Sequence, residues 1–397
     1  MIDPPPLSSQ RVLEVVKVFL RFGLTAFGGP SAHISMYHDE LVKRRRWLSE
    51  QHFLDLLGAT NLIPGPNSTE MAIHLSWVRA GLPGMLLGGI CFITPSMIMV
   101  IALAWAYSQY GSKPQAGWIM YGIQPIVIAI ILQALIDLGR KVINTLAISL
   151  VSLIASILYF LNISPVLILI LCGILVLVWQ NIHRVKAFRP NHLPIIITPP
   201  QIIEWIQRIN WSHLAVITSQ PFSFAVLFFT FLKIGAVLYG SGYVLLAFLN
   251  ADFVNRLGWL TEQQILDAVA VGQITPGPVL SSATFIGFIL GGLPGAIIAT
   301  IGIFLPSFIF VAFSNPLIPR IRNSPWAKSF LDGVIVASLG LMAAVIFQLG
   351  QVSFPDIFTG VICATAFILL VKYRVNTTWL ILGGLLIGLI AGNIHSS

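Results

Sequence analysis

The stretch LIPGPNST, residues 62–69, occurs a second time as ITPGPVLS, residues 274–281. The first prolines of the two Pro-Gly-Pro motifs, Pro64 and Pro276, lie 212 positions apart. Further matches at this shift, or at 211 farther along the chain, surround both motifs: Trp47 with Trp259, Asp55 with Asp267, Gly81 with Gly292, and Pro95-Ser96 with Pro306-Ser307. The sequence is therefore an internal duplication of one fold.

The composition places both copies in a lipid bilayer. Hydrophobic residues make up 56% of the chain and charged residues 9%, with a mean hydropathy of +0.89, whereas an average soluble domain has about 25% charged residues. The pI near 9.6 would suit nucleic acid, but no soluble domain is available to present a basic face, so we expect no nucleic-acid partner. The three cysteines lie far apart in apolar runs and indicate packed side chains, with no metal site and no cofactor expected.

Apolar segments long enough to span a bilayer, which takes about 20 residues, occur five times in each copy. They lie near residues 12–32, 84–108, 119–138, 142–162 and 164–180, and again near 222–248, 295–314, 328–350, 355–371 and 376–393.

Each copy also holds a less apolar segment, residues 50–80 or 262–292, with the Pro-Gly-Pro motif in its middle. Proline removes a backbone donor and disfavours helix at the residue before it, so each motif predicts two half-helices that form a re-entrant hairpin. Ser49 and Thr261 are the expected N-caps of the first half-helices, and Gln264 completes a capping box in the second copy.

The predicted fold is an all-α polytopic membrane protein of two inverted homologous repeats. Each repeat has about five transmembrane helices plus one re-entrant helical hairpin broken at Pro-Gly-Pro. The first repeat covers residues 1–181 and the second 221–397; residues 182–220 form a cytoplasmic linker with an interfacial helix.

The positive charges predict the orientation. With re-entrant hairpins, sixteen of the 22 Lys and Arg residues fall on one side, and three, Arg11, Lys113 and Arg256, on the other. The positive-inside rule makes the larger group cytoplasmic, which predicts an inner-membrane protein with both termini outside.

Inverted repeats with interrupted helices are typical of secondary transporters that bind their substrate where half-helix ends meet. After each motif a helix begins, and its free amides and positive dipole end favour an anion. The candidate substrate-binding residues at the two breaks are Asn61, Pro64, Gly65, Pro66, Asn67, Ser68 and Thr69, together with Gln273, Pro276, Gly277, Pro278, Ser281 and Ser282.

Arg21 and Lys233 are cations at equivalent positions inside apolar segments. Because a charge at the bilayer centre costs roughly 2.5–3.5 kcal/mol on insertion scales, both need a reason to be there. They are candidates to bind an anion directly, Arg21 above all because guanidinium can contact two oxygens at once. The alternative is that they snorkel to the membrane surface or pair with buried acids such as Glu70, Asp55 or Asp267.

Two further features carry open alternatives. Glu70 is a candidate proton-coupling carboxylate, although an acid in the first turn of a helix also complements its dipole. The FGGP run at 27–30 and its counterpart YGSG at 239–242 offer either a close backbone approach to the breaks or a hinge. The residues concerned are Gly28, Gly29, Pro30, Gly240 and Gly242.

The FGGP run, the WL-S/T-E sequences, IPGPNSTEMAIHL with its RAGLPG continuation, and GSGYV with TPGP in the second copy together resemble the chromate ion transporter family. The resemblance spans roughly residues 19–139 and 231–350. It implies a two-lobe inner-membrane carrier that exports chromate and confers chromate resistance, with sulfate as a close mimic. Gly242 replaces the proline of FGGP, so the two loops are not equivalent in sequence.

We therefore expect a secondary transporter that moves a tetrahedral oxyanion by alternating access, with chromate efflux as the first hypothesis. Uptake of sulfate or another oxyanion is the alternative within transport, and a membrane enzyme or scaffold that binds a phosphorylated lipid is the alternative from another class. The expected partners are the oxyanion and the bilayer, with a homodimer as a candidate assembly.

Overall fold

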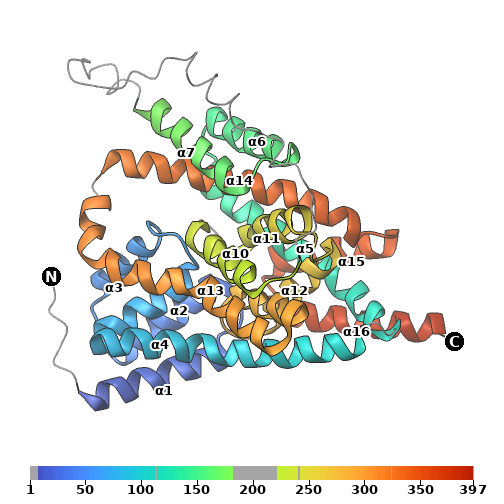
Figure 1. The fold of residues 1–397 in the computed structure, drawn as a ribbon, viewed down its shortest axis with the longest axis horizontal. Helices are drawn as coiled ribbons and strands as arrows, with labels where there is room; N and C mark the ends of the chain where they lie inside the picture. Colours follow the sequence, from blue (N-terminus) through green and yellow to red (C-terminus); the bar gives the residue numbers. More distant parts are fainter. Residues whose placement is uncertain (1–7, 112–113, 182–220, 240–241, 323, 397) are drawn as a thin grey trace.

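A computed structural model describes residues 8–111, 114–181, 221–239, 242–322 and 324–396 (Figure 1). The predicted linker with its interfacial helix, residues 182–220, lies outside the described residues, as does Gly240. Helices of the first repeat are α1 (Ser9–Thr25), α2 (Gly29–Tyr37), the π-helix η1 (His38–Arg44), α3 (Glu50–Thr60), α4 (Asn67–Tyr110), α5 (Pro114–Val142), α6 (Leu146–Phe160) and α7 (Pro165–Gln180).

The second repeat has matching helices at nearly the same spacing. They are α10 (Phe224–Val237), η3 (Gly242–Val244), α11 (Leu245–Leu249), the π-helix η4 (Asn250–Arg256), α12 (Glu262–Ile274), η5 (Val279–Ser281), α13 (Ser282–Arg322), α14 (Pro325–Ser353), α15 (Ile357–Tyr373) and α16 (Thr377–Ser396). In the described ranges, four helices are long and apolar enough to span a membrane, within α4, α5, η5–α13 and α14, and five shorter ones are apolar. The chain is a multi-pass helical membrane protein.

The duplication extends to individual backbone angles. Within α4 the helix is interrupted at Ala80 and Gly81, and within α13 at Gly291 and Gly292. Gly81 and Gly292 share φ 61° and ψ −153°, a conformation that glycine adopts without steric cost. Each long helix is therefore a short segment after the Pro-Gly-Pro motif, a kink, and a long segment beyond it.

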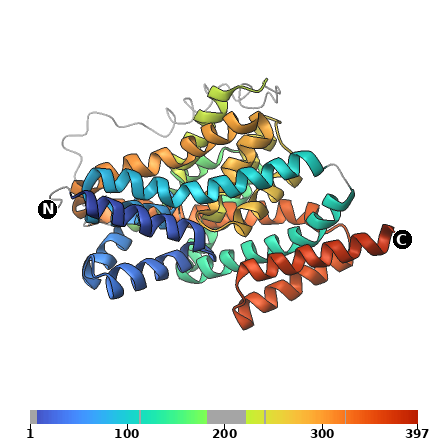
Figure 2. The ribbon, with the colours of Figure 1, turned by 90° about the horizontal axis from the view of Figure 1, so that it is seen from below.

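The equivalent helices α4 and α13 run antiparallel. Figures 1 and 2 show them side by side with their colour gradients reversed. A Cβ added at Gly89 would meet the ring of Phe308, while Met85, earlier in α4, shares a buried cluster with Val311, later in α13. Because residue numbers increase along α4 in the direction in which they decrease along α13, the two repeats are inverted relative to each other.

The first apolar segment of each repeat is shorter than predicted. Residues 12–32 were expected to form one crossing, but α1 ends at Thr25, and α2 and η1 follow. Glu14, near the start of α1, accepts hydrogen bonds from Arg45 at 3.0 Å and from Arg79 at 2.6 Å. The start of α1 therefore lies at the same end of the molecule as the basic residues that follow η1, and the prediction that they lie on opposite sides is wrong.

The second repeat makes the same return. The predicted segment 222–248 is divided, because α10 ends at Val237. The ring of Phe222, just before α10, lies 5.2 Å from that of Trp259, beyond η4. FGGP lies where the first of these segments turns, since Gly28 and Gly29 take φ values of 103° and 78° that other residues rarely adopt. In the second repeat, residues 240 and 241 lie outside the described residues.

The predicted N-caps are confirmed. The Ser49 hydroxyl accepts from the His52 amide, and Thr261 forms a capping box with Gln264. These side chains satisfy amides that the first helical turn leaves without intrahelical partners.

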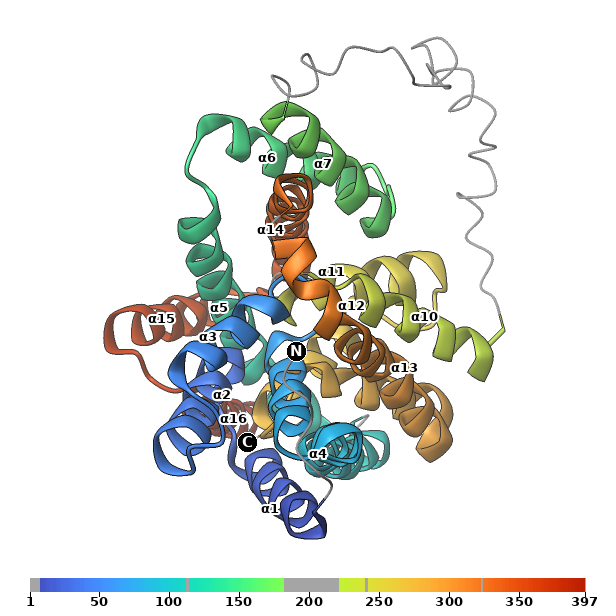
Figure 3. The same ribbon diagram turned by 90° about the vertical axis from the view of Figure 1, so that its left-hand side faces the viewer.

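The two repeats are interlocked in space. Helices α6 and α7 of the first repeat pack on α14 of the second, as Figure 3 shows, whereas α5 of the first packs on α15 and α16 of the second. Small residues permit both approaches: Gly340 meets the Ser152 carbonyl, and Gly122 meets the backbone of Gly384. Since α5 and α14 are equivalent, each repeat gives one long helix to the other.

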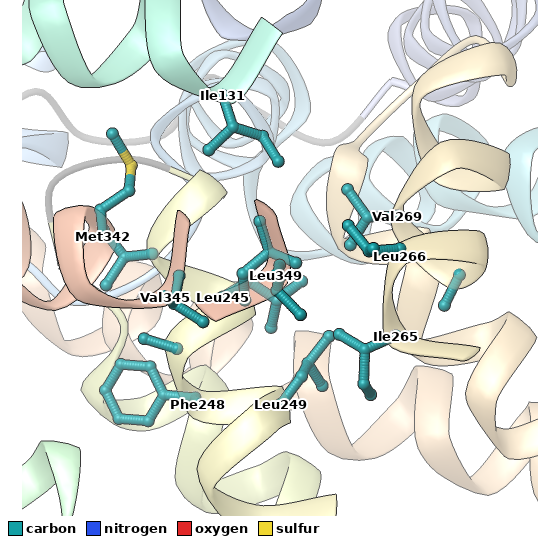
Figure 4. Close-up of a cluster of buried hydrophobic side chains, with 14 of the residues drawn as sticks. Ile131, Leu245, Phe248, Leu249, Ile265, Leu266, Val269, Met342, Val345 and Leu349 are labelled. Carbon is teal, nitrogen blue, oxygen red and sulfur yellow. The ribbon is translucent and has the colours of Figure 1, made fainter. Parts of the chain in front are cut away.

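The largest apolar core forms where these exchanged elements meet α11 and α12. Figure 4 shows side chains from α5, α11, α12 and α14 in contact there. The labelled members are Ile131, Leu245, Phe248, Leu249, Ile265, Leu266, Val269, Met342, Val345 and Leu349.

Candidate functional site

Both Pro-Gly-Pro motifs interrupt a helix. Helix α3 ends at Thr60 and α4 begins at Asn67, while α12 ends at Ile274 and η5 begins at Val279. Between them, Gly65 and Gly277 have φ values of 138° and 97°, which favour glycine. The prolines on either side, Pro64, Pro66, Pro276 and Pro278, supply no amide to continue the helix.

The breaks meet the opposite repeat through two equivalent hydrogen bonds. The Gly65 amide donates to the Leu238 carbonyl at 2.7 Å, and the Gly277 amide donates to the Ala26 carbonyl at 2.9 Å. All four residues correspond at the shift of 212. Each break is thereby fastened to the residue just beyond the first helix of the other repeat, which places both breaks at the interface between repeats.

Space beside each glycine is restricted. A Cβ added at Gly65 would collide with the Glu70 carboxyl and lie 3.0 Å from the Ser307 hydroxyl, whereas at Gly277 it would lie 3.0 Å from the Ser96 Cβ. Ser96 and Ser307 were matched in the sequence but were not predicted as site residues. The structure brings them from the long segments of α4 and α13 to the break of the opposite repeat.

Several groups at the breaks are already hydrogen-bonded. Asn67 donates to Asn61 at 2.6 Å, and Asn61 donates to the Leu57 carbonyl. The amides of Thr69 and Glu70 share the Pro66 carbonyl. Ser68, also in this first turn, is buried.

In the second break, the Ser282 hydroxyl donates to the Val279 carbonyl at 2.8 Å. Gln273 is buried and its side chain interacts with Tyr243. Gly242 lies against Val279 and Leu280. Pro30, by contrast, occupies the first turn of α2.

Other polar atoms at the breaks have no partner. Among the described residues, the hydroxyls of Thr69, Ser96, Ser281 and Ser307 and both carboxyl oxygens of Glu70 are buried without a hydrogen bond. All five residues are 0% exposed. An unsatisfied buried polar group costs about 1–3 kcal/mol, so a cluster of them at one interface indicates a place for a ligand or for water.

A family comparison supports this assignment of the repeats. The model described as "Chromate transporter" matches residues 13–177 and again residues 225–389, so the second match begins and ends 212 residues after the first. This chain belongs to the chromate transporter family. Members of this family are membrane transporters and not enzymes, which confirms the expectation of a transporter rather than a membrane enzyme.

Named relatives of this transporter cover nearly its whole length. It is 32% identical over 387 residues to the "Chromate transport protein" of Cupriavidus metallidurans, covering 95% of this chain and 92% of the relative. It is 33% identical over 369 residues to the "Probable chromate transport protein" of Synechococcus elongatus (89% and 88%), and 30% over 392 residues to the "Chromate transport protein" of Pseudomonas aeruginosa (97% and 93%). No solved structure matches this chain.

Arg21 and Lys233, the cationic residues at equivalent positions in the two repeats, are paired with acids of their own repeats. Arg21 lies 3.1 Å from a Glu40 oxygen, and the Lys233 ammonium donates to Asp252 at 2.6 Å. Pairing was one of the two alternatives, but with Glu70, Asp55 or Asp267 as the acids. Neither cation supplies one of the three atoms nearest to a Cβ added at Gly65 or Gly277.

Glu40 and Asp252 are equivalent at the shift of 212, and both lie in π-helices. Arg44 and Arg256 contact the same two acids from one turn farther on. A recoverable signal was present in the sequence: an acid at each matched position, followed four residues later by arginine. Hydrogen bonds from Arg45 and Arg21 hold the pKa of Glu40 below its ordinary value despite the opposing effect of burial.

Asp267, one of the acids considered above as a partner for Arg21 and Lys233, accepts hydrogen bonds from Tyr107 and Gln124, each at 2.8 Å. Its counterpart Asp55 accepts one from Gln51 within α3. The two acids match in sequence but differ in burial, Asp267 being buried and Asp55 partly exposed. Asp267 links α12 to α4 and α5.

Proposed function

We propose that this chain is a secondary transporter that exports chromate, a tetrahedral oxyanion, from the cytoplasm and so confers chromate resistance. The names of its relatives supply the substrate class. The observation that carries the site is the pair of equivalent hydrogen bonds from Gly65 and Gly277, which brings both helix breaks and their unpartnered donors to one interface.

The proposed binding region is formed by two re-entrant hairpins. One consists of α3 and residues 67–79 of α4, and the other of α12, η5 and residues 282–290 of α13. The helix starts after the breaks aim amides and the positive ends of their dipoles at the interface. Hydroxyls add donors without adding charge, so binding relies on neutral donors rather than on Arg21 and Lys233, whose charges are balanced by Glu40 and Asp252.

Glu70 is the proposed coupling group. It is buried beside Gly65 with no hydrogen-bond partner among the described residues. An ionised Glu70 carboxylate would repel a dianion bound at the same break, because the dielectric constant there is low. We therefore expect Glu70 to be protonated while the anion is bound, so that one proton crosses with the dianion and the inside-negative membrane potential drives the remaining negative charge outward. The titratable groups near it include His74, one turn along α4, and Tyr239, whose hydroxyl donates to the Leu62 carbonyl at 3.2 Å.

The orientation follows from contacts and charges together. Because Glu14 binds Arg45 and Arg79, the start of α1 belongs on the side of the basic residues, and the positive-inside rule makes this side cytoplasmic. Figure 1 shows α16 ending at the opposite end of the long axis from the start of α1. We propose an inner-membrane protein with the N-terminus inside and the C-terminus outside.

Alternating access would move the repeats about their pseudo-two-fold axis. Since α5 and α14 are exchanged between repeats, the moving units would combine helices of both: α5 with α15 and α16, and α14 with α6 and α7. The breaks would then open in turn to either side.

Flux through purified protein tests the function. When a proton gradient is imposed across the membrane of proteoliposomes, it should drive uptake or release of chromate. Sulfate should compete with this flux. Movement of sulfate without chromate would favour the alternative substrate, and binding of phosphorylated lipid with no anion flux would overturn the transport proposal. A matched protein with Gly65→Ala and Gly277→Ala serves as the inactive control.

A further inference from the structure

We propose that Ser96 and Ser307, with Thr69 and Ser281, form two equivalent pairs of hydroxyl donors that bind the oxygens of a tetrahedral oxyanion. This inference rests on the proposed transport function and adds two binding residues that the sequence did not single out. Thr69 and Ser281 correspond at a shift of 212, and Ser96 and Ser307 at 211. The four buried hydroxyls therefore form two sets related by the symmetry of the repeats.

Several helical serine and threonine residues in this protein donate to the carbonyl one turn back. Ser76, Thr94, Ser108 and Ser353 all do so, at distances of 2.7–2.9 Å. Ser96 and Ser307 also lie inside long helices, yet neither makes this bond. Their hydroxyls are thus left unpartnered in a context where a local acceptor is ordinarily available.

The packing of the first helices explains the difference. Gly23 of α1 lies so close to α4 that a Cβ there would be 2.7 Å from the Phe92 carbonyl oxygen. Gly235 of α10 lies closer still to the Ile303 carbonyl oxygen. Phe92 and Ile303 are the residues four positions before Ser96 and Ser307, so the carbonyls that would accept these hydroxyls are covered by a neighbouring helix.

The position of the serines connects them to the breaks. Ser307 lies against Gly65 beside Glu70, and Ser96 lies against Gly277. Thr69 and Ser281 stand in the first turns after the same breaks. Each break therefore has one hydroxyl from its own repeat and one from the other. Four neutral O–H donors suit the four oxygens of a tetrahedral dianion, because each can donate without bringing a competing acceptor charge.

The test measures binding and stability in the same purified, full-length protein. Calorimetric titration with sodium chromate and, separately, with sodium sulfate gives the Kd, and thermal unfolding without anion gives the Tm. Ser96→Ala and Ser307→Ala are the variants. Ser353→Ala is the matched control, since this buried hydroxyl donates to the Leu349 carbonyl.

We expect each variant to raise the Kd about tenfold or more, as loss of a hydrogen bond to a charged group does, while the Tm without anion stays equal or rises. Ser353→Ala should leave the Kd unchanged. Variants that bind as the wild type does would overturn the proposal, and so would a lowered Tm without anion, which would mean that the hydroxyls serve internal or water-mediated bonds. If the wild type binds neither anion, the proposed function fails, and this inference with it.

Comparison of the two titrations tests whether chromate and sulfate bind to the same four hydroxyl donors. Equal weakening of chromate and sulfate is expected from donors that recognise shape and oxygen number alone. Weakening confined to one anion, with the other bound as by the wild type, would overturn the common four-donor site.

Discussion

At the scale of single residues, glycines decide how closely neighbouring segments approach, between the repeats at Gly65 and Gly277 and within each repeat at Gly23 and Gly235. Gly65 and Gly277 need positive φ values and donate across the interface, while Gly23 and Gly235 lie directly on carbonyl oxygens of α4 and α13. A side chain at any of these positions would push the two surfaces apart. The unpartnered hydroxyls of Ser96 and Ser307 lie beside Gly277 and Gly65.

Gly65→Ala should abolish transport. The added Cβ meets Glu70, and the φ of 138° is strained for alanine, a cost of order 1–3 kcal/mol. Chromate flux in proteoliposomes and the Tm measure the effect. Gly58→Ala in α3 is the control, because nothing lies within 4 Å of its Cβ; equal losses in both variants would contradict a specific role for the break.

Glu70→Gln should retain chromate binding but lose proton coupling. Glutamine keeps the size of the side chain and cannot exchange a proton, so substrate should equilibrate without being driven by a pH gradient. Simultaneous recording of chromate and proton flux tests this, with Glu50→Gln at the exposed start of α3 as the control. Continued proton-driven accumulation by Glu70→Gln would rule out Glu70 as the coupling group.

At the scale of helices, the repeats share an ion-pair arrangement that fixes the returning segment to the first helix. In each, an acid of a π-helix contacts one cation from the first helix of the repeat and one from its own next turn, and Glu40 also binds Arg45. A π-helix carries an extra residue per turn and often occurs at functional positions. Here it orients Glu40 and Asp252 toward α1 and α10.

The Arg21–Glu40 pair should show coupling in a double-mutant cycle. Arg21→Gln and Glu40→Gln should each lower the Tm, and the double variant should lose less than their sum, because both single variants remove the same Arg21–Glu40 contact. Glu40 keeps Arg44 and Arg45 as partners when Arg21 is replaced. Arg21 is 52% exposed, so solvent screening keeps the effect modest. Strictly additive losses would mean that the pair contributes no interaction of its own.

The same pair predicts a pH dependence. Since the pKa of Glu40 is lowered in the folded state, its stabilising contribution is present above the unfolded-state pKa and is lost as the pH falls through the folded-state pKa. The Tm of the wild type should therefore decline on acidification more steeply than that of Glu40→Gln. Parallel Tm-against-pH curves for the two proteins would contradict this linkage.

At the scale of the whole molecule, the repeats are inverted and exchange helices α5 and α14. Their interface is thus not a surface between two compact lobes, because each sequence half completes the other. The ranges 1–181 and 221–397 mark the two copies of the duplicated sequence. They are not two structural units that could move independently. Separate expression of either half is expected to give no stable domain.

Labelling of single cysteines should distinguish the two sides. Gln51 and Gln263 are exposed and equivalent at the shift of 212, so inversion requires Gln51→Cys and Gln263→Cys to react from opposite sides of the membrane. Ser9→Cys should react from the same side as Gln51→Cys. The background is a protein with its three cysteines replaced by alanine. Labelling of positions 51 and 263 from one side would refute the inverted arrangement.

The sequence alone determined the duplication, the breaks and the local caps. A shift of 212 residues identifies equivalent positions, and proline, glycine, Ser49 and Thr261 act on the backbone within a few residues of themselves. The anion-binding tendency of a helix start is likewise a local property. These features needed no knowledge of how distant segments pack.

Only the tertiary structure decided which distant groups meet. The sequence did not reveal that the start of α1 lies beside Arg79, that Arg21 and Lys233 pair with Glu40 and Asp252, or that Gly65 bonds to Leu238 in the other repeat. Nor did it single out Ser96 and Ser307, whose unpartnered hydroxyls depend on Gly23 and Gly235 covering two carbonyls. Such contacts join residues that lie far apart in the chain, so they are fixed by packing between helices and between repeats rather than by the preference of any one segment.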